Sequence, residues 1–161
     1  MADLTYNIVE MTLTGSIDGK AFHATAFSGG RAGSKQAKAV HPILANNPFL
    51  TNVKLSKDTP GGALPLGLYE LKTHEKRKYW IRLNPLAGNS MKGRAGFAIH
   101  GRGQRGSDGC IVPEAFDNVL TIHALCAARE KAGRAAPTLE VMAVGDLDHI
   151  QNRMANWAST A

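Results

Sequence analysis

The sequence predicts a mainly β domain with flanking helices, and three observations support that prediction. The chain has 161 residues, which is the size of one domain with a real hydrophobic core. Its 17 glycines and 7 prolines favour strands and turns over a helical bundle. Apolar residues follow helical spacing over a long segment only after residue 113, whereas several strand-like segments occur before it. We expect a single domain over residues 1–161, with its core in residues 4–145 and a C-terminal helix over residues 146–157.

The first part of the chain is predicted to form a β-hairpin followed by irregular structure. Residues 4–13 are rich in β-branched side chains and partly alternate, which predicts one strand. Residue types typical of turns occur over residues 15–20. A second strand is predicted over residues 21–27, which completes the hairpin. Residues 31–63 lack periodicity, so they form either a lid over a groove or a surface excursion. His41 in that segment is expected to be a solvated loop residue.

The middle of the chain predicts a second hairpin and a further strand. Strands are expected over residues 67–73 and 79–83, around a solvated charged turn at residues 75–78, with His74 facing solvent. Trp80 is expected to pack against the sheet, and sugar stacking is the alternative. Residues 96–100 predict the next strand.

The last third of the chain predicts one long helix, a strand and a final helix. Pro113 suits the first turn of the long helix, and Gly133 suits its end. Within this helix, His123 is expected to be structural and Cys126 to be buried in the core. Residues 139–144 predict the last strand, and Asp146 suits the cap of the final helix.

The stretch FAIHGRGQRGSDGCIVP, residues 97–113, is the strongest candidate for a functional site. A short apolar strand leads to His100, a glycine-rich turn follows, and Cys110 comes before the predicted long helix. A cysteine that folding can bring to a histidine is a recognised nucleophile pattern, and cations and a helix N-terminus favour the thiolate. The alternative is an inert buried cysteine in a flexible glycine loop.

Several neighbours of the cysteine would have roles if the pair meets. Backbone N–H groups of residues 108–110 are expected to face a developing oxyanion, and Ser107 or a nearby carbonyl to orient the imidazole. Asp108 is expected to pair with Arg102 or Arg105, or to cap the turn. The two arginines either bind substrate carboxylates or are solvated loop charges.

These residues resemble a known family. The run IHG at residues 99–101, a short insert and SDGCIV at residues 107–112 resemble the signature of the L,D-transpeptidase catalytic domain, the YkuD-like fold. Residues 64–71 resemble its strand entry, and residues 27–29 resemble an element of a compact subgroup that includes type VI secretion effectors. The resemblance covers residues 4–145. The sequence departs from the family at Asp108, where histidine is usual, and at Val112, where arginine is usual.

The resemblance implies a β-sandwich or barrel-like fold and acyl transfer on peptidoglycan stem peptides. The activity would be that of an L,D-carboxypeptidase, an L,D-transpeptidase or a D-amino acid exchange enzyme. No metal or organic cofactor is implied. The catalytic set comprises Cys110 as the nucleophile and His100 as the proton carrier, with Ser107, Asp108 and Gly109. The substrate-binding set comprises Gly101, Arg102, Arg105 and Tyr69.

Charge and the terminal sequence restrict the expected partners and location. A formal charge of +6 and a pI of about 9.6 favour a polyanionic partner such as cell wall. No basic run resembles a nucleic-acid arm, and no segment approaches a membrane span, so we expect neither partner. The N-terminal residues lack a signal-peptide pattern. Together with the subgroup resemblance, this predicts an antibacterial toxin made in the cytoplasm without a Sec signal peptide and delivered by a secretion system to a target's periplasm, with an immunity protein as partner.

Three other functions compete with this prediction. A metal site is the first, because the potential ligands include His41, His74, His100 and Cys110, although their spacing does not match a metal motif. A generic cysteine peptidase acting on ordinary proteins is the second. A non-catalytic cell-wall-binding module, suggested by the positive charge, is the third.

Overall fold

The computed structural model describes residues 1–29, 42–51, 53–54, 60–101 and 109–160, so the prediction for His41 lies outside the described residues. The elements within these ranges follow in chain order: β1 (Leu4–Asn7), β2 (Thr12–Ile17), β3 (Lys20–Ser28), the 3-10 helix η1 (Pro42–Leu44), β4 (Val53–Lys54), β5 (Pro60–Gly61), β6 (Gly67–Thr73), β7 (Ile81–Pro85), β8 (Ala98–Ile99), β9 (Ile111–Pro113), α1 (Phe116–Lys131), β10 (Thr138–Met142) and α2 (Asp148–Thr160).

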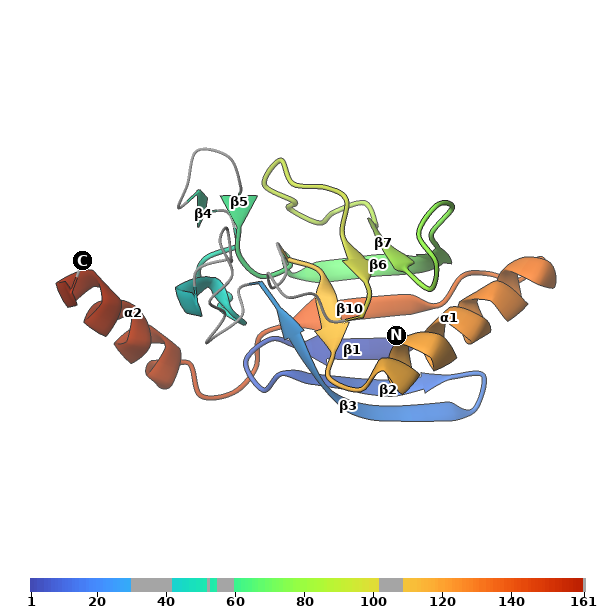
Figure 1. Ribbon diagram of the computed structural model, residues 1–161, viewed down its shortest axis with the longest axis horizontal. Helices are drawn as coiled ribbons and strands as arrows, with labels where there is room; N and C mark the ends of the chain where they lie inside the picture. The colour runs from blue at the N-terminus through green and yellow to red at the C-terminus, as the bar shows by residue number, and fades with distance from the viewer. Residues whose placement is uncertain (30–41, 52, 55–59, 102–108, 161) are drawn as a thin grey trace.

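Eight of these strands form a closed barrel, which confirms the prediction of a mainly β fold with helices (Figure 1). The order around the barrel is β1-β10-β6-β7-β8-β9-β3-β2. Strand β1 is parallel to β10, and β8 is parallel to β9, while the other neighbours are antiparallel. Strands β4 and β5 form a separate two-stranded sheet. The parallel pairing of β8 with β9 lies directly beside His100 and Cys110, because Ile99 pairs with Ile111.

Alternation along the strands fills the barrel with large apolar side chains. Successive side chains on a strand point to opposite faces, so every second residue enters the interior. The fully buried residues that line this core include Leu4, Tyr6, Leu13, Ile17, Tyr69, Leu71, Ile81, Ile99, Ile111 and Leu139.

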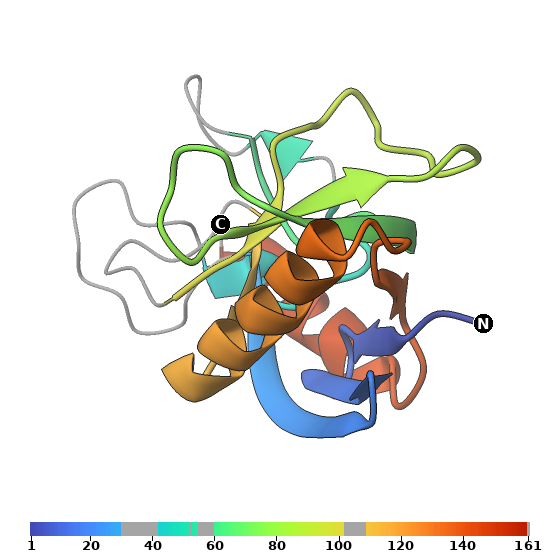
Figure 2. The same cartoon turned by 90° about the vertical axis from the view of Figure 1, so that its right-hand side faces the viewer.

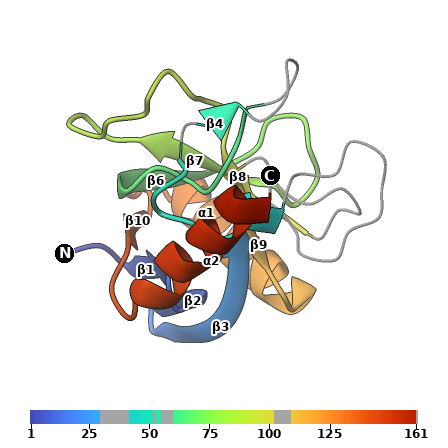
Figure 3. The ribbon, with the colours of Figure 1, turned by 90° about the vertical axis from the view of Figure 1, so that its left-hand side faces the viewer.

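The two helices lie at opposite ends of the molecule (Figures 1–3). Helix α1 crosses one end of the barrel, where Val119, Ile122 and Cys126 join the barrel core (Figure 2). The prediction that Cys126 is buried is therefore confirmed. Helix α2 lies beside η1 at the other end, and Ile150 is buried there (Figure 3). Within the described ranges, neither helix combines the length and apolarity that a membrane span requires.

The cap of the last helix is confirmed. The Asp148 N–H donates to the Asp146 side chain at 3.0 Å, which satisfies a backbone donor before α2. The helix begins at Asp148 and ends at Thr160, so it is shifted by about one turn from the predicted range.

Several predicted boundaries are wrong, and among them is the strand predicted over residues 79–83, which is β7 and begins at Ile81. Residues 4–13 form not one strand but two, because the chain turns over residues 8–11, where Met11 has a positive φ of 57°. Pro113 ends strand β9, paired with Ala26, and helix α1 begins at Phe116 instead. The described part of residues 31–63 is not wholly irregular, because it contains η1, β4 and β5.

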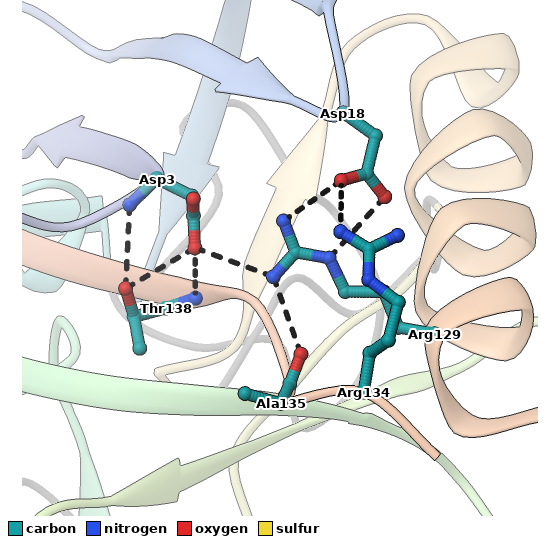
Figure 4. A network of polar contacts seen from close by, with 6 residues as sticks. All are labelled: Asp3, Asp18, Arg129, Arg134, Ala135 and Thr138. Atoms are coloured by element: carbon teal, nitrogen blue, oxygen red, sulfur yellow. Dashed lines mark hydrogen bonds and ion pairs between the residues drawn. The ribbon is translucent and has the colours of Figure 1, made fainter. Parts of the chain in front are cut away.

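A polar network joins the β2–β3 turn to the end of α1 and to the N-terminus (Figure 4). The Arg129 guanidinium donates to both oxygens of the Asp18 carboxylate, at 3.1 and 3.2 Å, and Arg134 donates to the same group at 3.0 Å. The Asp3 carboxylate lies 3.8 Å from Arg129 and accepts the Thr138 N–H at 2.9 Å. This network closes the barrel end that α1 covers.

Replacing Asp18 with asparagine is expected to lower the melting temperature at pH 7, and this effect should disappear in acid. Hydrogen bonds from Arg129 and Arg134 hold the pKa of the Asp18 carboxyl below its usual value. The folded pKa is lower than the unfolded pKa, so the stabilisation is present above the unfolded value, about 4, and is lost as pH falls through the folded one. Asparagine suits the test because it tolerates the positive φ of 48° at this position.

Thermal unfolding of wild type and variant between pH 7 and pH 2 measures this difference. Glu114→Gln is the matched control, because Glu114 is an exposed carboxylate at the other end of α1. A pH-independent difference for Asp18→Asn would show that the carboxylate charge contributes nothing.

Candidate functional site

The parallel pairing of β8 and β9 places His100 and Cys110 on the same face of the barrel wall. Ile99 lies opposite Ile111, and both are fully buried in the barrel. The His100 N–H donates to the Ile111 carbonyl at 3.1 Å, so the ladder continues past β8. Side chains alternate along each strand, so His100 and Cys110 both point away from the interior. Both are half-buried.

The register also sets the separation of the two residues. Cys110 lies beside Ala98, two residues before His100, which gives a Cα–Cα distance of about 8 Å from ordinary strand dimensions. An imidazole spans a diagonal of this kind. The Ala98 N–H donates to the Cys110 Sγ at 3.4 Å, and such a donor favours the thiolate. The predicted meeting of a histidine and a cysteine is therefore possible in this fold.

The His100 imidazole is oriented by the next carbonyl in the chain. Its Nδ1 lies 2.6 Å from the Gly101 oxygen. A carbonyl can only accept a hydrogen bond, so Nδ1 carries the proton and Nε2 is the basic atom. Burial has the largest effect and lowers the pKa of His100, the Gly101 hydrogen bond raises it by less, and the Arg77 charge has the smallest effect and lowers it. The imidazole is therefore neutral at pH 7, as a general base requires.

A buried serine ties the residue before Cys110 to two other parts of the chain. Ser28 is fully buried at the end of β3. Its hydroxyl donates to the Gly109 carbonyl at 2.9 Å and accepts the Leu64 N–H at 3.0 Å. Because both contacts are far away in sequence, one hydroxyl fixes the approach of Gly109 to the barrel wall.

The guanidinium of Arg94 lies close to Gly109, because a Cβ built on this glycine would be 2.7 Å from it. It donates to the carbonyls of Ala63 at 2.9 Å and Gly62 at 3.1 Å, and also to the Thr51 carbonyl. It lies 4.9 Å from the centroid of the Phe97 ring. Arg94 thus links Thr51 and residues 62–63 to the residue before Cys110.

Replacing Ser28 with alanine is expected to cost about 2–4 kcal/mol of unfolding free energy, because it removes the buried hydroxyl that bonds both the Gly109 carbonyl and the Leu64 N–H. Urea unfolding of both proteins measures the loss. Ser16→Ala is the matched control, since Ser16 lies exposed on β2 and its loss should change stability by less than about 0.5 kcal/mol. Equal stabilities of Ser28→Ala and Ser16→Ala would contradict the role given to the Ser28 hydroxyl.

The remaining predicted site residues have different outcomes. Tyr69 does not fit the substrate-binding role, because it is fully buried and its hydroxyl donates to the Pro65 carbonyl at 2.7 Å. Gly101 contributes its carbonyl to His100, which makes it an orienting residue in this structure. The predictions for four residues lie outside the described part of the chain: Arg102, Arg105, Ser107 and Asp108.

Two local predictions around the site are also corrected. Cys110 precedes strand β9 rather than a helix, so the N-terminus of α1 is not adjacent to it in the chain. His74 does not face solvent, because its side chain is only 12% exposed and its Nδ1 accepts two backbone N–H groups. Sequence reasoning included Ser28 only in the family resemblance of residues 27–29 and assigned it no structural role, and it did not identify Arg94 or the contact between Trp80 and His100. An arginine among glycines and a serine at a strand end are the only local signals for the first two.

The fold and site together define an eight-stranded β-barrel domain with a half-buried cysteine and a half-buried histidine on the same face of two neighbouring strands. Within the described residues, no group of three or more histidine, cysteine, aspartate or glutamate side chains gathers to hold a metal. In comparisons with known proteins, no family model, curated protein or solved structure matches this chain.

Proposed function

We propose that the chain has an L,D-transpeptidase-like, YkuD-like fold and transfers acyl groups of peptidoglycan stem peptides through Cys110. The observation that carries the proposal is the register of β8 with β9, which sets Cys110 on the same face as His100. The neutral imidazole, with its Nε2 available as a base, supports the same reaction class. The resemblance of residues 97–113 to the family signature supplies the substrate class.

The reaction begins with transfer of the Cys110 Sγ proton to the His100 Nε2. The thiolate attacks the carbonyl carbon of the third, diamino acid residue of the stem, at its L-centre. The C–N bond to the terminal D-alanine breaks, and His100 gives its proton to the leaving amine. A thioester on Cys110 remains.

The acceptor that opens the thioester decides the product. Water gives a tripeptide stem, the amine of a second stem gives a 3–3 crosslink, and a D-amino acid gives an exchanged stem. In each case His100 takes a proton from the acceptor, and the sulfur leaves as thiolate or thiol. The chain supplies the same two groups for all three products.

Incubation of wild-type protein with purified tetrapeptide muropeptides, followed by mass spectrometry, tests the proposal. We expect loss of one D-alanine or formation of a 3–3 dimer. After an acid quench, we also expect a thioester on the peptide that contains Cys110.

Cys126→Ala is the matched control for this experiment. Burial raises the pKa of the Cys126 thiol to about 12, so this cysteine stays protonated and its loss should leave the products unchanged. Cleavage of ordinary proteins without any change in muropeptides would favour a generic cysteine peptidase. Binding to wall fragments without chemistry would favour a wall-binding module. Either result overturns the proposal.

We also propose that the protein acts as a delivered antibacterial toxin, with a neutralising partner protein. The support is the short spacing from His100 to Cys110, which resembles that of type VI secretion effectors, together with the charge of +6, which suits an anionic wall. Expression in a bacterium with and without an added periplasmic export signal tests delivery. Growth arrest and loss of tetrapeptide stems are expected only with export, and equal effects without export would contradict this proposal.

A further inference from the structure

The ring of Trp80 lies flat on the imidazole of His100. Their centroids are 4.1 Å apart and their planes differ by 11°, which is a stacked arrangement. The hydrogen bond from Nδ1 to Gly101 holds the same imidazole at its edge. The stack on Trp80 therefore restrains the plane of the His100 ring, and the hydrogen bond to Gly101 restrains the rotation of the ring within that plane.

The turn between β6 and β7 is built to present Trp80. His74 Nδ1 accepts the N–H groups of Lys76 and Arg77, each at 3.0 Å, and the Trp80 N–H donates to the Arg77 carbonyl at 3.2 Å. The His74 N–H donates to the Trp80 carbonyl at 2.9 Å. These bonds fix a turn whose side chains at residues 75–79 are largely exposed.

Tyr79 adds a strained conformation directly before Trp80. Its φ is +63°, which is unusual for an aromatic residue and costs energy that surrounding contacts must offset. Its ring meets Phe116 edge-on at 6.3 Å and His123 at 5.6 Å, both from α1. Contacts with α1 thus support the backbone conformation directly before Trp80.

Arg77 completes the arrangement. Its guanidinium carbon lies 4.4 Å from the Trp80 ring centroid, within cation–π distance. Two titratable groups lie beside the Trp80–His100 pair: the Arg77 charge acts on His100, and the His74 ring meets Trp80 edge-on at 6.1 Å. Glu75 does not neutralise Arg77, because its carboxylate is paired with Arg82.

We infer that Trp80 is a positioning residue, which holds the His100 imidazole in one orientation and one tautomer so that Nε2 accepts the Cys110 proton. This inference rests on the proposed function for its catalytic meaning, but the orientation of His100 is measurable without any substrate. In the proton transfer, the S–H bond of Cys110 breaks and an N–H bond forms at Nε2. The stack with Trp80 keeps Nε2 directed toward the Cys110 Sγ while the imidazole gains a proton and a positive charge.

Nuclear magnetic resonance of the histidine rings tests the inference in Trp80→Leu and Trp80→Phe. In Trp80→Leu, we expect the titration midpoint of His100 to move to higher pH, because water reaches the ring, and the single Nδ1–H tautomer to become a mixture. Trp80→Phe should restore both properties. The exposed His23 serves as an internal control whose signals should stay unchanged. A folded Trp80→Leu protein with unchanged His100 titration and tautomer would overturn the inference.

Two further measurements distinguish failure of the positioning role from failure of the proposed substrate. The wild-type protein itself should show upfield ring-current shifts of the His100 ring protons, and their absence would overturn the inference even if Trp80→Leu does not fold. If the muropeptide reaction is found, Trp80→Leu should lower kcat about ten-fold with little change in KM. If that reaction is absent while the ring signals behave as expected, the proposed substrate fails and the positioning role stands.

Discussion

Replacing Cys110 with alanine is expected to reduce release of D-alanine from tetrapeptide stems by at least about a thousand-fold, because alanine cannot form the thioester. Substrate binding should persist, since the side chain removed is small and half-buried. Mass spectrometry of muropeptides gives the rate, and sedimentation with purified wall gives the binding. A variant that retains wild-type turnover would eliminate the cysteine mechanism.

The same assay separates the cysteine from its base. His100→Ala is expected to lose about 10²–10⁴-fold in kcat, which is the usual contribution of a general acid–base group. The double variant should be no slower than Cys110→Ala alone, because the two residues act as one unit. His23→Ala is the matched control, as His23 is an exposed histidine on β3. Additive losses in the double variant would show that the two side chains act independently.

Local patterns predicted the elements whose conformation is decided locally. The strands β3, β6 and β10 and the helix α1 follow apolar periodicity, which depends only on near neighbours. The predicted element boundaries were wrong where tertiary contacts decide the backbone conformation. Met11 and Tyr79 have positive φ values of 57° and 63°, and neither residue type signals that conformation in a sequence. Pro113 suits a helix start as well as a strand, and its pairing with β3 decides between them.

The same distinction explains the site. His100 and Cys110 were selected as candidates because a glycine-rich sequence separates two apolar segments, which is a local sequence pattern. The residues that support them act across the fold: Ser28 reaches Gly109 over 81 positions, and Arg94 reaches the Thr51 carbonyl over 43. Tyr69 was placed at the site by resemblance alone, but the alternation of β6 directs it to the core with Leu71.

Gly109→Ala is expected to be the most disruptive single substitution next to the nucleophile, costing about 3 kcal/mol or more of unfolding free energy. Gly109 has a φ of +118°, which L side chains rarely adopt. A Cβ there would lie 2.5 Å from the Phe97 ring, 2.7 Å from the Arg94 guanidinium and 3.1 Å from the Gly62 carbonyl. The arginine is held by carbonyls and the ring is buried, so neither can move away cheaply.

Gly133→Ala is the control that separates backbone strain from steric clash as causes of the stability loss in Gly109→Ala. Gly133 also has a positive φ, +66°, but a Cβ there would meet no atom within 4 Å, so its cost should be only about 1–2 kcal/mol of backbone strain. Urea unfolding of both variants measures the difference, which isolates the close packing around Gly109. The Gly109 carbonyl accepts the Ser28 hydroxyl hydrogen bond. The methyl group added in Gly109→Ala should therefore also displace Cys110 and slow its alkylation by iodoacetamide. Equal stability of the two variants would mean that the chain before Cys110 is not held as tightly as Ser28 and Arg94 indicate.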